Sequence, residues 1–88
     1  MGAEHDPGQA IGLVNHYFSH LSVAAVTLNA PLAVGERIHI RGRTTDVEQT
    51  VDSMQVDHKA VESAKPGDDV AIKVADHVRD HDLIFREG

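Results

Sequence analysis

Arg37-Ile38-His39-Ile40-Arg41 is the stretch of sequence that decides the fold. Two isoleucines alternate here with three polar residues. This two-residue period is typical of a β-strand with one face in a core and the other in solvent. The pattern therefore predicts a strand over residues 37–41 whose outer face is basic.

Five more strands are predicted on either side of this one. They are runs of β-forming residues separated by turn signals such as Asn29-Ala30-Pro31 and Lys65-Pro66-Gly67-Asp68. The six predicted strands cover residues 11–18, 23–28, 37–41, 47–56, 70–74 and 83–85. The first two, joined by a short link, suggest a hairpin. Short strands at spacings of about ten residues, without a helical period, indicate an all-β closed barrel or small sandwich.

Three details of this pattern add local expectations. The alternation over residues 47–51 and that over residues 54–56 are out of phase by one residue, which predicts a β-bulge near Asp52-Ser53 and a strongly bent fourth strand. Gly12, inside the first strand, indicates a bulge or a close approach of two backbones. Residues 58–64 are weakly patterned and fit either a turn or a single helical turn.

Length and composition limit the possible classes of protein. The 88 residues fit one domain, predicted over residues 10–86, with residues 1–9 as a flexible tail. The chain has no cysteine, which excludes disulfides and thiolate metal sites. Residues 1–10 lack the apolar segment of a signal peptide, and no apolar run reaches the roughly 20 residues of a membrane span. We therefore expect a cytoplasmic protein without membrane contact.

Three further segments resemble a known family. Leu32-Ala33-Val34-Gly35-Glu36, residues 50–56 and residues 64–72 occur in the order and spacing of the second domain of translational GTPases such as elongation factor Tu. The resemblance covers residues 11–85. It is closest to small free-standing elongation-factor-like proteins and to the C-terminal barrel of collagenase-like peptidases. It implies a six-stranded closed Greek-key-like barrel of the translation-factor domain 2 type.

The glycines of these segments make physical sense. Gly35 and Gly67 each precede an acidic residue, a combination that suits a tight turn before a barrel strand. The chain departs from the family at Ala71 and His81, where family members often carry glycine. The backbone at these two positions is therefore expected to be less tightly packed or differently turned.

The resemblance implies a binding function more than a catalytic one. The chain has no G-x-x-x-x-G-K-[ST] sequence, so we expect neither GTP binding nor another cofactor. The leading hypothesis is a non-catalytic domain that docks on RNA, including transfer RNA or the ribosome, on a ribonucleoprotein or on a protein. The alternative is a stand-alone accessory protein-recognition domain for an enzyme of the collagenase-like peptidase family.

The basic strand is the candidate binding site. The net charge of −6 argues against a general polyanion binder, but residues 37–43 contain three arginines and no acidic residue. The predicted contact residues are Arg37, His39, Arg41 and Arg43. The alternative is a solvated strand face whose cations pair with Glu48 and Asp52. With one tyrosine and two phenylalanines in the chain, the aromatic residues that often stack on single-stranded RNA are scarce.

Other chemistry is not predicted. His16 and His20, like His77 and His81, are four residues apart, but such pairs converge on a metal only on a helix, so no metal site is expected. The serines lack a nucleophile-elbow context, and the acidic residues define no acid–base pair, so the chain is not expected to be an enzyme. Self-association through an uncovered strand edge stays open, and the oligomeric state is not determined.

Overall fold

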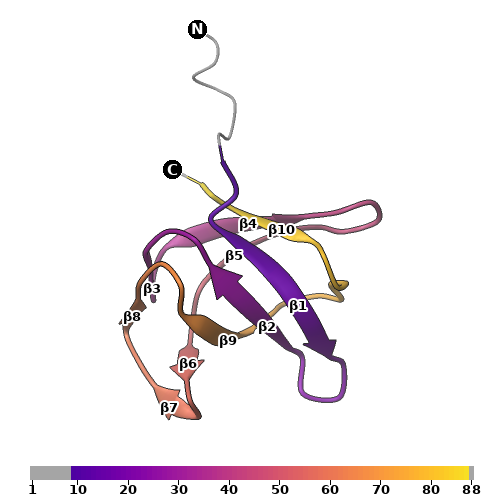
Figure 1. Ribbon diagram of the computed structural model, residues 1–88. Coiled ribbons are helices and arrows are strands. Elements are labelled where there is room, and N and C mark those ends of the chain that lie inside the picture. Colours follow the sequence, from indigo (N-terminus) through magenta and orange to yellow (C-terminus); the bar gives the residue numbers. More distant parts are fainter. Residues whose placement is uncertain (1–8, 88) are drawn as a thin grey trace, which may run out of the picture.

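The computed structural model describes residues 9–87, and Figure 1 shows their path. Within these residues the chain forms ten strands and no helix. The strands are β1 (Gly12–Phe18), β2 (Val23–Leu28), β3 (Leu32–Ala33), β4 (Arg37–Arg41), β5 (Asp46–Thr50), β6 (Met54–Val56), β7 (Lys59–Ala60), β8 (Ser63–Ala64), β9 (Asp69–Lys73) and β10 (Leu83–Arg86). The all-β prediction is confirmed. The predicted tail lies outside the described residues, apart from Gln9.

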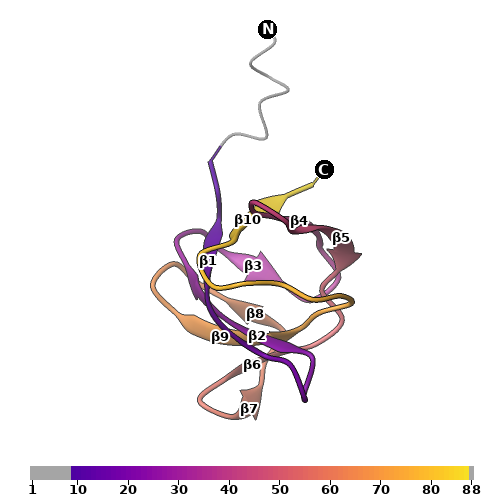
Figure 2. The same ribbon diagram turned by 90° about the vertical axis from the view of Figure 1, so that its right-hand side faces the viewer.

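Eight strands form one sheet in the order β5-β4-β10-β1-β2-β9-β6-β7, while β3 and β8 form a separate pair. All neighbours in the large sheet are antiparallel. The predicted hairpin of the first two strands is confirmed by the pairing of β1 with β2. Figures 1 and 2 show that the sheet curls strongly around the interior.

The curled sheet is open, so the predicted closed barrel of six strands is wrong. The predicted fourth strand is two strands, because β5 pairs with β4 whereas β6 pairs with β9 and β7. Between them, the Val51 N–H donates to the Glu36 carbonyl (2.9 Å) and the Val51 carbonyl accepts from the Gly35 N–H (2.8 Å). After these bonds the chain crosses from one end of the sheet to the other. No bulge keeps the strand continuous at Asp52-Ser53, and a register shift lies instead in the β1–β2 pair, between Val14 and His16.

The side chain of Gln49 spans the seam left by this break. The β6–β9 ladder ends at the Met54–Ile72 pair, so the backbone groups of residues 73–75 have no strand opposite them there. The Gln49 amide fills that place, since its Nε2 donates to the Lys73 carbonyl (2.9 Å) and its Oε1 accepts from the Ala75 N–H (2.7 Å). A buried side-chain amide thus acts as one peptide unit of a missing strand.

The core lies inside the curl and collects the inward residues of nearly every long strand. On β4 the expected alternation holds, with Ile38 and Ile40 buried. Gly12 marks a close approach, as predicted, because a Cβ there would lie 2.9 Å from Val26 Cγ1. The largest fully buried side chains are Leu28, Leu32, Ile38, Ile40, Met54, Ile72, Ile84, Val14, Val26, Val51 and Val78.

Two glycine turns set the entry into β4 and β9. Gly35 has a φ of 99° and Gly67 a φ of 92°, a backbone conformation that costs glycine little and other residues much more. At the second turn the Asp68 N–H donates to the Lys65 carbonyl (3.1 Å), and the Lys65 N–H donates to the Asp68 carboxylate (3.0 Å). The predicted glycine–acid turns are confirmed at both places.

The weakly patterned segment, residues 58–64, contains a turn and two short strands. Asp57 and His58 connect β6 to β7 with φ values of 53° and 65°. Positive φ at both central residues is the geometry of a tight two-residue hairpin. The single helical turn considered for this segment is therefore not formed, and β8 pairs with β3 instead.

His81 occupies a position that favours glycine. Its φ is 75°, in the left-handed region, although its N–H keeps a bond to the Val14 carbonyl (2.8 Å). Glycine adopts this backbone conformation with less strain than histidine does. Ala71, the other departure, lies in regular strand β9, paired with Ala25 and Gln55.

Replacing Gln49 with leucine is expected to lower the free energy of unfolding by about 1–3 kcal/mol, because two part-buried backbone groups, the Lys73 carbonyl and the Ala75 N–H, lose their partners. Urea denaturation measures this change. The matched control is Gln55→Leu, at an exposed glutamine of β6, which should change stability by less than about 0.5 kcal/mol. Equal effects of the two substitutions would show that the amide does not hold the seam.

Replacing His81 with glycine is expected to raise the free energy of unfolding by about 0.5–1 kcal/mol, because the left-handed strain is relieved. His20→Gly is the control, since His20 is exposed and has no positive φ. There glycine only adds freedom to the unfolded chain, so stability should fall. A loss of stability in both variants, measured by thermal or urea unfolding, would contradict the strain at His81.

Candidate functional site

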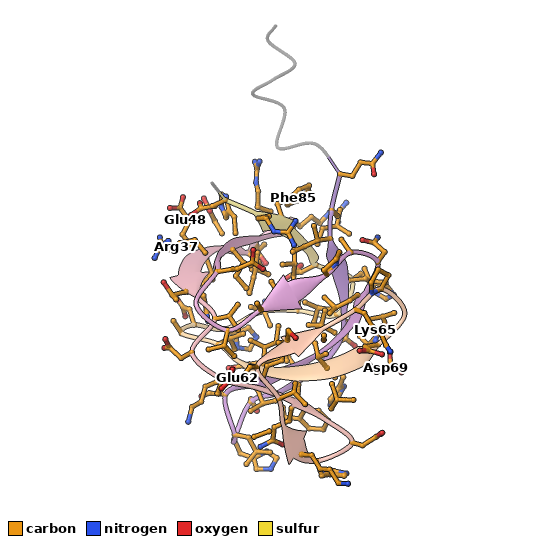
Figure 3. The ribbon with its side chains drawn as sticks, turned by 90° about the vertical axis from the view of Figure 1, so that its left-hand side faces the viewer. Arg37, Glu48, Glu62, Lys65, Asp69 and Phe85 are labelled. Atoms are coloured by element: carbon orange, nitrogen blue, oxygen red, sulfur yellow. The ribbon has the colours of Figure 1, made fainter. Side chains whose placement is uncertain are left out.

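The predicted basic residues lie where the alternation placed them. Arg37, His39 and Arg41 project from the outer face of β4, and Arg43 lies in the turn between β4 and β5. Figure 3 shows Arg37 and Glu48 side by side at one end of the molecule. Their neighbourhood is set by the strands that flank β4, which are β5 and β10.

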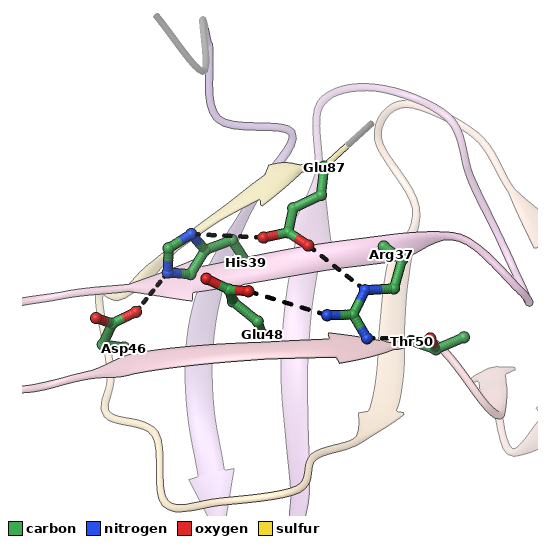
Figure 4. Close-up of polar contacts among 6 residues, drawn as sticks. All are labelled: Arg37, His39, Asp46, Glu48, Thr50 and Glu87. Atoms are coloured by element: carbon green, nitrogen blue, oxygen red, sulfur yellow. Dashed lines mark hydrogen bonds and ion pairs between the residues drawn. The ribbon is translucent and has the colours of Figure 1, made fainter. Parts of the chain in front are cut away.

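Three carboxylates surround the first two of these residues (Figure 4). Arg37 Nη2 lies 3.9 Å from Glu48 Oε1, and its Nε lies 3.5 Å from Glu87 Oε1. His39 Nε2 lies 2.5 Å from Asp46 Oδ1, and its Nδ1 lies 3.9 Å from Glu87 Oε2. Arg37 and His39 thus form a mixed-charge network with two acidic residues of β5 and with Glu87, which follows β10.

The network agrees with the solvated-face alternative more closely than with a basic patch. Glu48 pairs as that alternative supposed, but Asp52 is not among the partners found in residues 9–87. Arg37 and Glu48 keep side-chain exposures of 51% and 54%. Such exposed pairs contribute little stability, so their main effect is to reduce the positive field of β4.

Arg41 and Arg43 differ from the other two predicted residues. Arg41 lies opposite Asp46 in the register, yet no ion pair of Arg41 or Arg43 is found within residues 9–87. The binding role of the four residues stays a prediction, and within residues 9–87 the two that form no ion pair lie at the end of β4 and in the β4–β5 turn.

Sequence reasoning missed Glu87 and Asp46 as partners. Asp46 was assigned to a turn, although it is the first residue of β5 and lies diagonally across from His39. Extending the alternation of β5 backward by one residue would have found it. Glu87 had no such signal, because it reaches the network only through the pairing of β10 with β4.

The same network contains a set of groups that could hold a metal. Ligand atoms of His39, Glu48 and Glu87 lie within 4.8 Å of one another. However, the Arg37 guanidinium contacts both glutamates and already supplies the positive charge that a metal would bring. The arrangement is therefore that of an ion-pair network.

The histidine pairs considered at the sequence level are engaged elsewhere. The His16 ring packs edge-on against Phe18, with centroids 4.4 Å apart, and the His77 ring packs edge-on against Tyr17 at 4.6 Å. Within the described residues the two pairs, His16 with His20 and His77 with His81, form no metal-binding group.

Open hollows lie on other parts of the surface. One of about 560 Å³ is lined by apolar and polar side chains of β1, β2, β6, β9 and their connections, including Phe18, Leu21 and Lys73. Another of about 520 Å³ is lined by Tyr17, Ser19 and residues 77–80. Among residues 9–87 no serine hydroxyl forms a hydrogen bond with a histidine, so neither hollow contains an activated nucleophile of the serine–histidine kind.

Comparisons with known proteins place this fold. No model of a known family matches the chain. A protein described as an uncharacterized protease of Methanocaldococcus jannaschii is 42% identical over 76 residues, which cover 85% of this chain and 19% of that protein. The chain therefore corresponds to about a fifth of that relative's length.

Two crystal structures of one domain have the same fold as this chain. Both are of the C-terminal domain of a Geobacillus thermoleovorans protein described as a U32 peptidase. One has a TM-score of 0.86, with 18% identity, and covers 93% of this chain and 96% of that chain. The selenomethionine variant has a TM-score of 0.82, with 18% identity, and covers 88% and 98%.

These findings bear differently on the two family resemblances stated in the sequence analysis. The two structures show that the fold is that of the C-terminal domain of a protein described as a U32 peptidase, of the collagenase-like family, and the archaeal relative is described as a protease. The likeness to domain 2 of elongation factor Tu is not confirmed. Among the described residues, no helix is long and apolar enough to cross a membrane.

Isothermal calorimetry with zinc is expected to detect no site tighter than micromolar, because Arg37 neutralises the carboxylates beside His39. The control is Arg37→Gln, which removes that cation, leaves the three potential ligands in place and should strengthen any binding. Micromolar binding by the unmodified chain that disappears in His39→Ala would contradict this expectation.

Proposed function

We propose that this chain acts as a non-catalytic accessory domain for an enzyme of the U32 peptidase family, and that this enzyme is the protein partner it recognises. The observation that carries the proposal is the similarity to the archaeal protein described as a protease. The two are 42% identical over 85% of this chain, and the match covers 19% of that protein. A segment of that proportion corresponds to one domain of a larger protein, and a small β-domain beside an enzyme commonly serves binding.

The crystal structures support the idea of a separate folding unit. The matching Geobacillus chains consist almost entirely of this domain, since the alignment covers 96% and 98% of them. The hollows of the described residues are open and contain no nucleophile bonded to a base. These features favour recognition over chemistry as the role of the domain.

The RNA hypothesis has weaker support. Affinity for RNA depends on uncompensated lysine and arginine next to phosphates. Two of the four predicted contact residues, Arg37 and His39, lie against carboxylates, which leaves Arg41 and Arg43 as the candidate phosphate contacts. Protein recognition is therefore the preferred reading.

Affinity capture with the tagged chain tests the proposal. The lysate comes from the chain's own organism, and one half of it is treated with ribonuclease while the other half is not. We expect one stoichiometric protein of the U32 group in both halves and no co-purifying nucleic acid, by mass spectrometry and absorbance. The purified chain should not cleave casein or gelatin.

The control is the double substitution Arg41→Ala and Arg43→Ala, which should capture the same protein. Recovery of RNA that is lost in this variant would favour the RNA hypothesis. Hydrolysis of a protein substrate by the purified chain would show that it is not an accessory domain only.

A further inference from the structure

We propose that the outer edge of β5, the backbone of residues 46–50, is a strand-addition site for an extended peptide carrying basic side chains. This inference rests on the proposed protein-recognition function and specifies its surface and the chemistry of the partner. β5 is one end of the eight-stranded sheet, so one of its two edges pairs with β4 and the other has no strand beside it.

The direction of the free backbone groups follows from the hydrogen bonds at both ends of the β4–β5 pair. The Val51 N–H donates to the Glu36 carbonyl, and the Gly42 N–H donates to the Thr45 carbonyl. In an antiparallel pair, hydrogen-bonded and non-hydrogen-bonded positions alternate. Val47 and Gln49 therefore bond to β4, and the intervening residues direct their N–H and carbonyl groups away from it. Those residues are Asp46, Glu48 and Thr50.

The pairing on the other side of β4 agrees with this assignment. The Glu87 N–H donates to the Arg37 carbonyl (3.0 Å), so Arg37, His39 and Arg41 direct their backbone groups to β10. Ile38 and Ile40 must then direct theirs to β5. Two independent sets of hydrogen bonds thus show which residues of β5 bond to β4 and which direct their backbone groups away from it.

Few groups of the described chain satisfy this free edge. No backbone hydrogen bond joins residues 46–50 to residues 74–82 within the part of the chain that the structure describes. The contact across the seam is made by the Gln49 side chain, which also reaches the Thr50 carbonyl at 3.4 Å. Free N–H and carbonyl groups two residues apart are what an added strand pairs with.

The surface beside the edge is hollowed on both sides of Gln49. One hollow, of about 420 Å³, includes Asp46, Val47 and Asp76 in its wall, and the other, of about 330 Å³, includes Gln49, Thr50 and Asp52. Each hollow is bounded by β5 and its flanking residues on one side and by residues within 73–79 on the other, which include Arg79 in the first hollow and Lys73 in the second. An added strand there would take the place of the Gln49 amide, because that amide now bonds to the Lys73 carbonyl and the Ala75 N–H.

Charge selects a basic occupant and disfavours a second copy of this chain. Asp46 and Glu48 project from the outer face of β5, where they contact His39 and Arg37 on the β4 side, and Asp52 follows β5. In a symmetric pairing of two β5 edges about their centre, Glu48 would lie opposite Glu48, which is repulsive. Lysine or arginine opposite Glu48 is attractive, so the edge fits an extended basic segment.

The test uses a fluorescein-labelled, end-blocked peptide of alternating lysine and valine, with fluorescence anisotropy for affinity and NMR-detected amide exchange for location. We expect binding about ten-fold tighter than that of a glutamate–valine peptide. Exchange should slow by about ten-fold at the amides of Asp46, Glu48 and Thr50, and not at Val47 and Gln49, which already bond to β4.

A matched pair of variants isolates the backbone contribution. Glu48→Pro removes an N–H that the β4 ladder does not use, and prolines are tolerated at such edges. Glu48→Thr removes the same charge and keeps the N–H. Glu48→Pro should weaken peptide binding about ten-fold more than Glu48→Thr. If Glu48→Pro does not fold, a peptide with alternate N-methylated amides must lose binding to the unmodified chain.

Three results would overturn the inference. The first is that the two Glu48 variants bind the peptide equally and that the unmodified chain still binds the N-methylated peptide. The second is slowed exchange away from β5, and the third is no binding of the lysine–valine peptide. Slowed exchange at β5 that rises with chain concentration alone would also overturn it, in favour of self-pairing. Repeating the affinity capture separates the two proposals. If both Glu48 variants capture the partner protein equally, strand addition at β5 is refuted but protein recognition is not. If the unmodified chain captures no partner, protein recognition is refuted, and the peptide titration still tests strand addition at β5.

Discussion

The curled sheet depends on one side-chain amide at the place where its backbone ladder fails. β5 and β6 are consecutive in the chain but lie toward opposite ends of the sheet order, because residues 51–53 leave the ladder. Gln49 bonds to Lys73 and Ala75 across the resulting seam. A fully paired strand there would close the sheet and remove its edges. The amide instead satisfies two backbone groups and leaves the outer edge of β5 free.

The charged face is organised by the same strand order. β4 lies between β5 and β10, so its basic side chains meet acids contributed from both sides. Arg37 and His39 become part of an ion-pair network, while Arg41 and Arg43 lie toward the turn. Two of the acids that balance β4, Asp46 and Glu48, belong to β5 and border its free edge. Binding chemistry suggested by the basic strand therefore shifts, in the folded protein, toward an acidic strand beside it.

Local features of the sequence predicted a large part of the fold. The alternation in residues 37–41 and the turns at Gly35 and Gly67 are decided by residues near in sequence and were predicted correctly, and the close approach at Gly12 was one of the two alternatives given for that glycine. The continuity of residues 47–56 was predicted wrongly. The phase slip between residues 51 and 54 is compatible with a bulge or with a break, and only the position of β9 distinguishes them.

The sequence by itself determined where most of the longer strands lie, which of their faces are buried, and where the glycine turns fall, because these depend on a two-residue period and on local backbone preference. Only the tertiary structure decided that the sheet stays open and that the basic face of β4 is paired with acids. Both depend on which strands become neighbours. Glu87 is fifty positions from Arg37, and it reaches Arg37 only because β10 pairs with β4. No local pattern encodes that proximity.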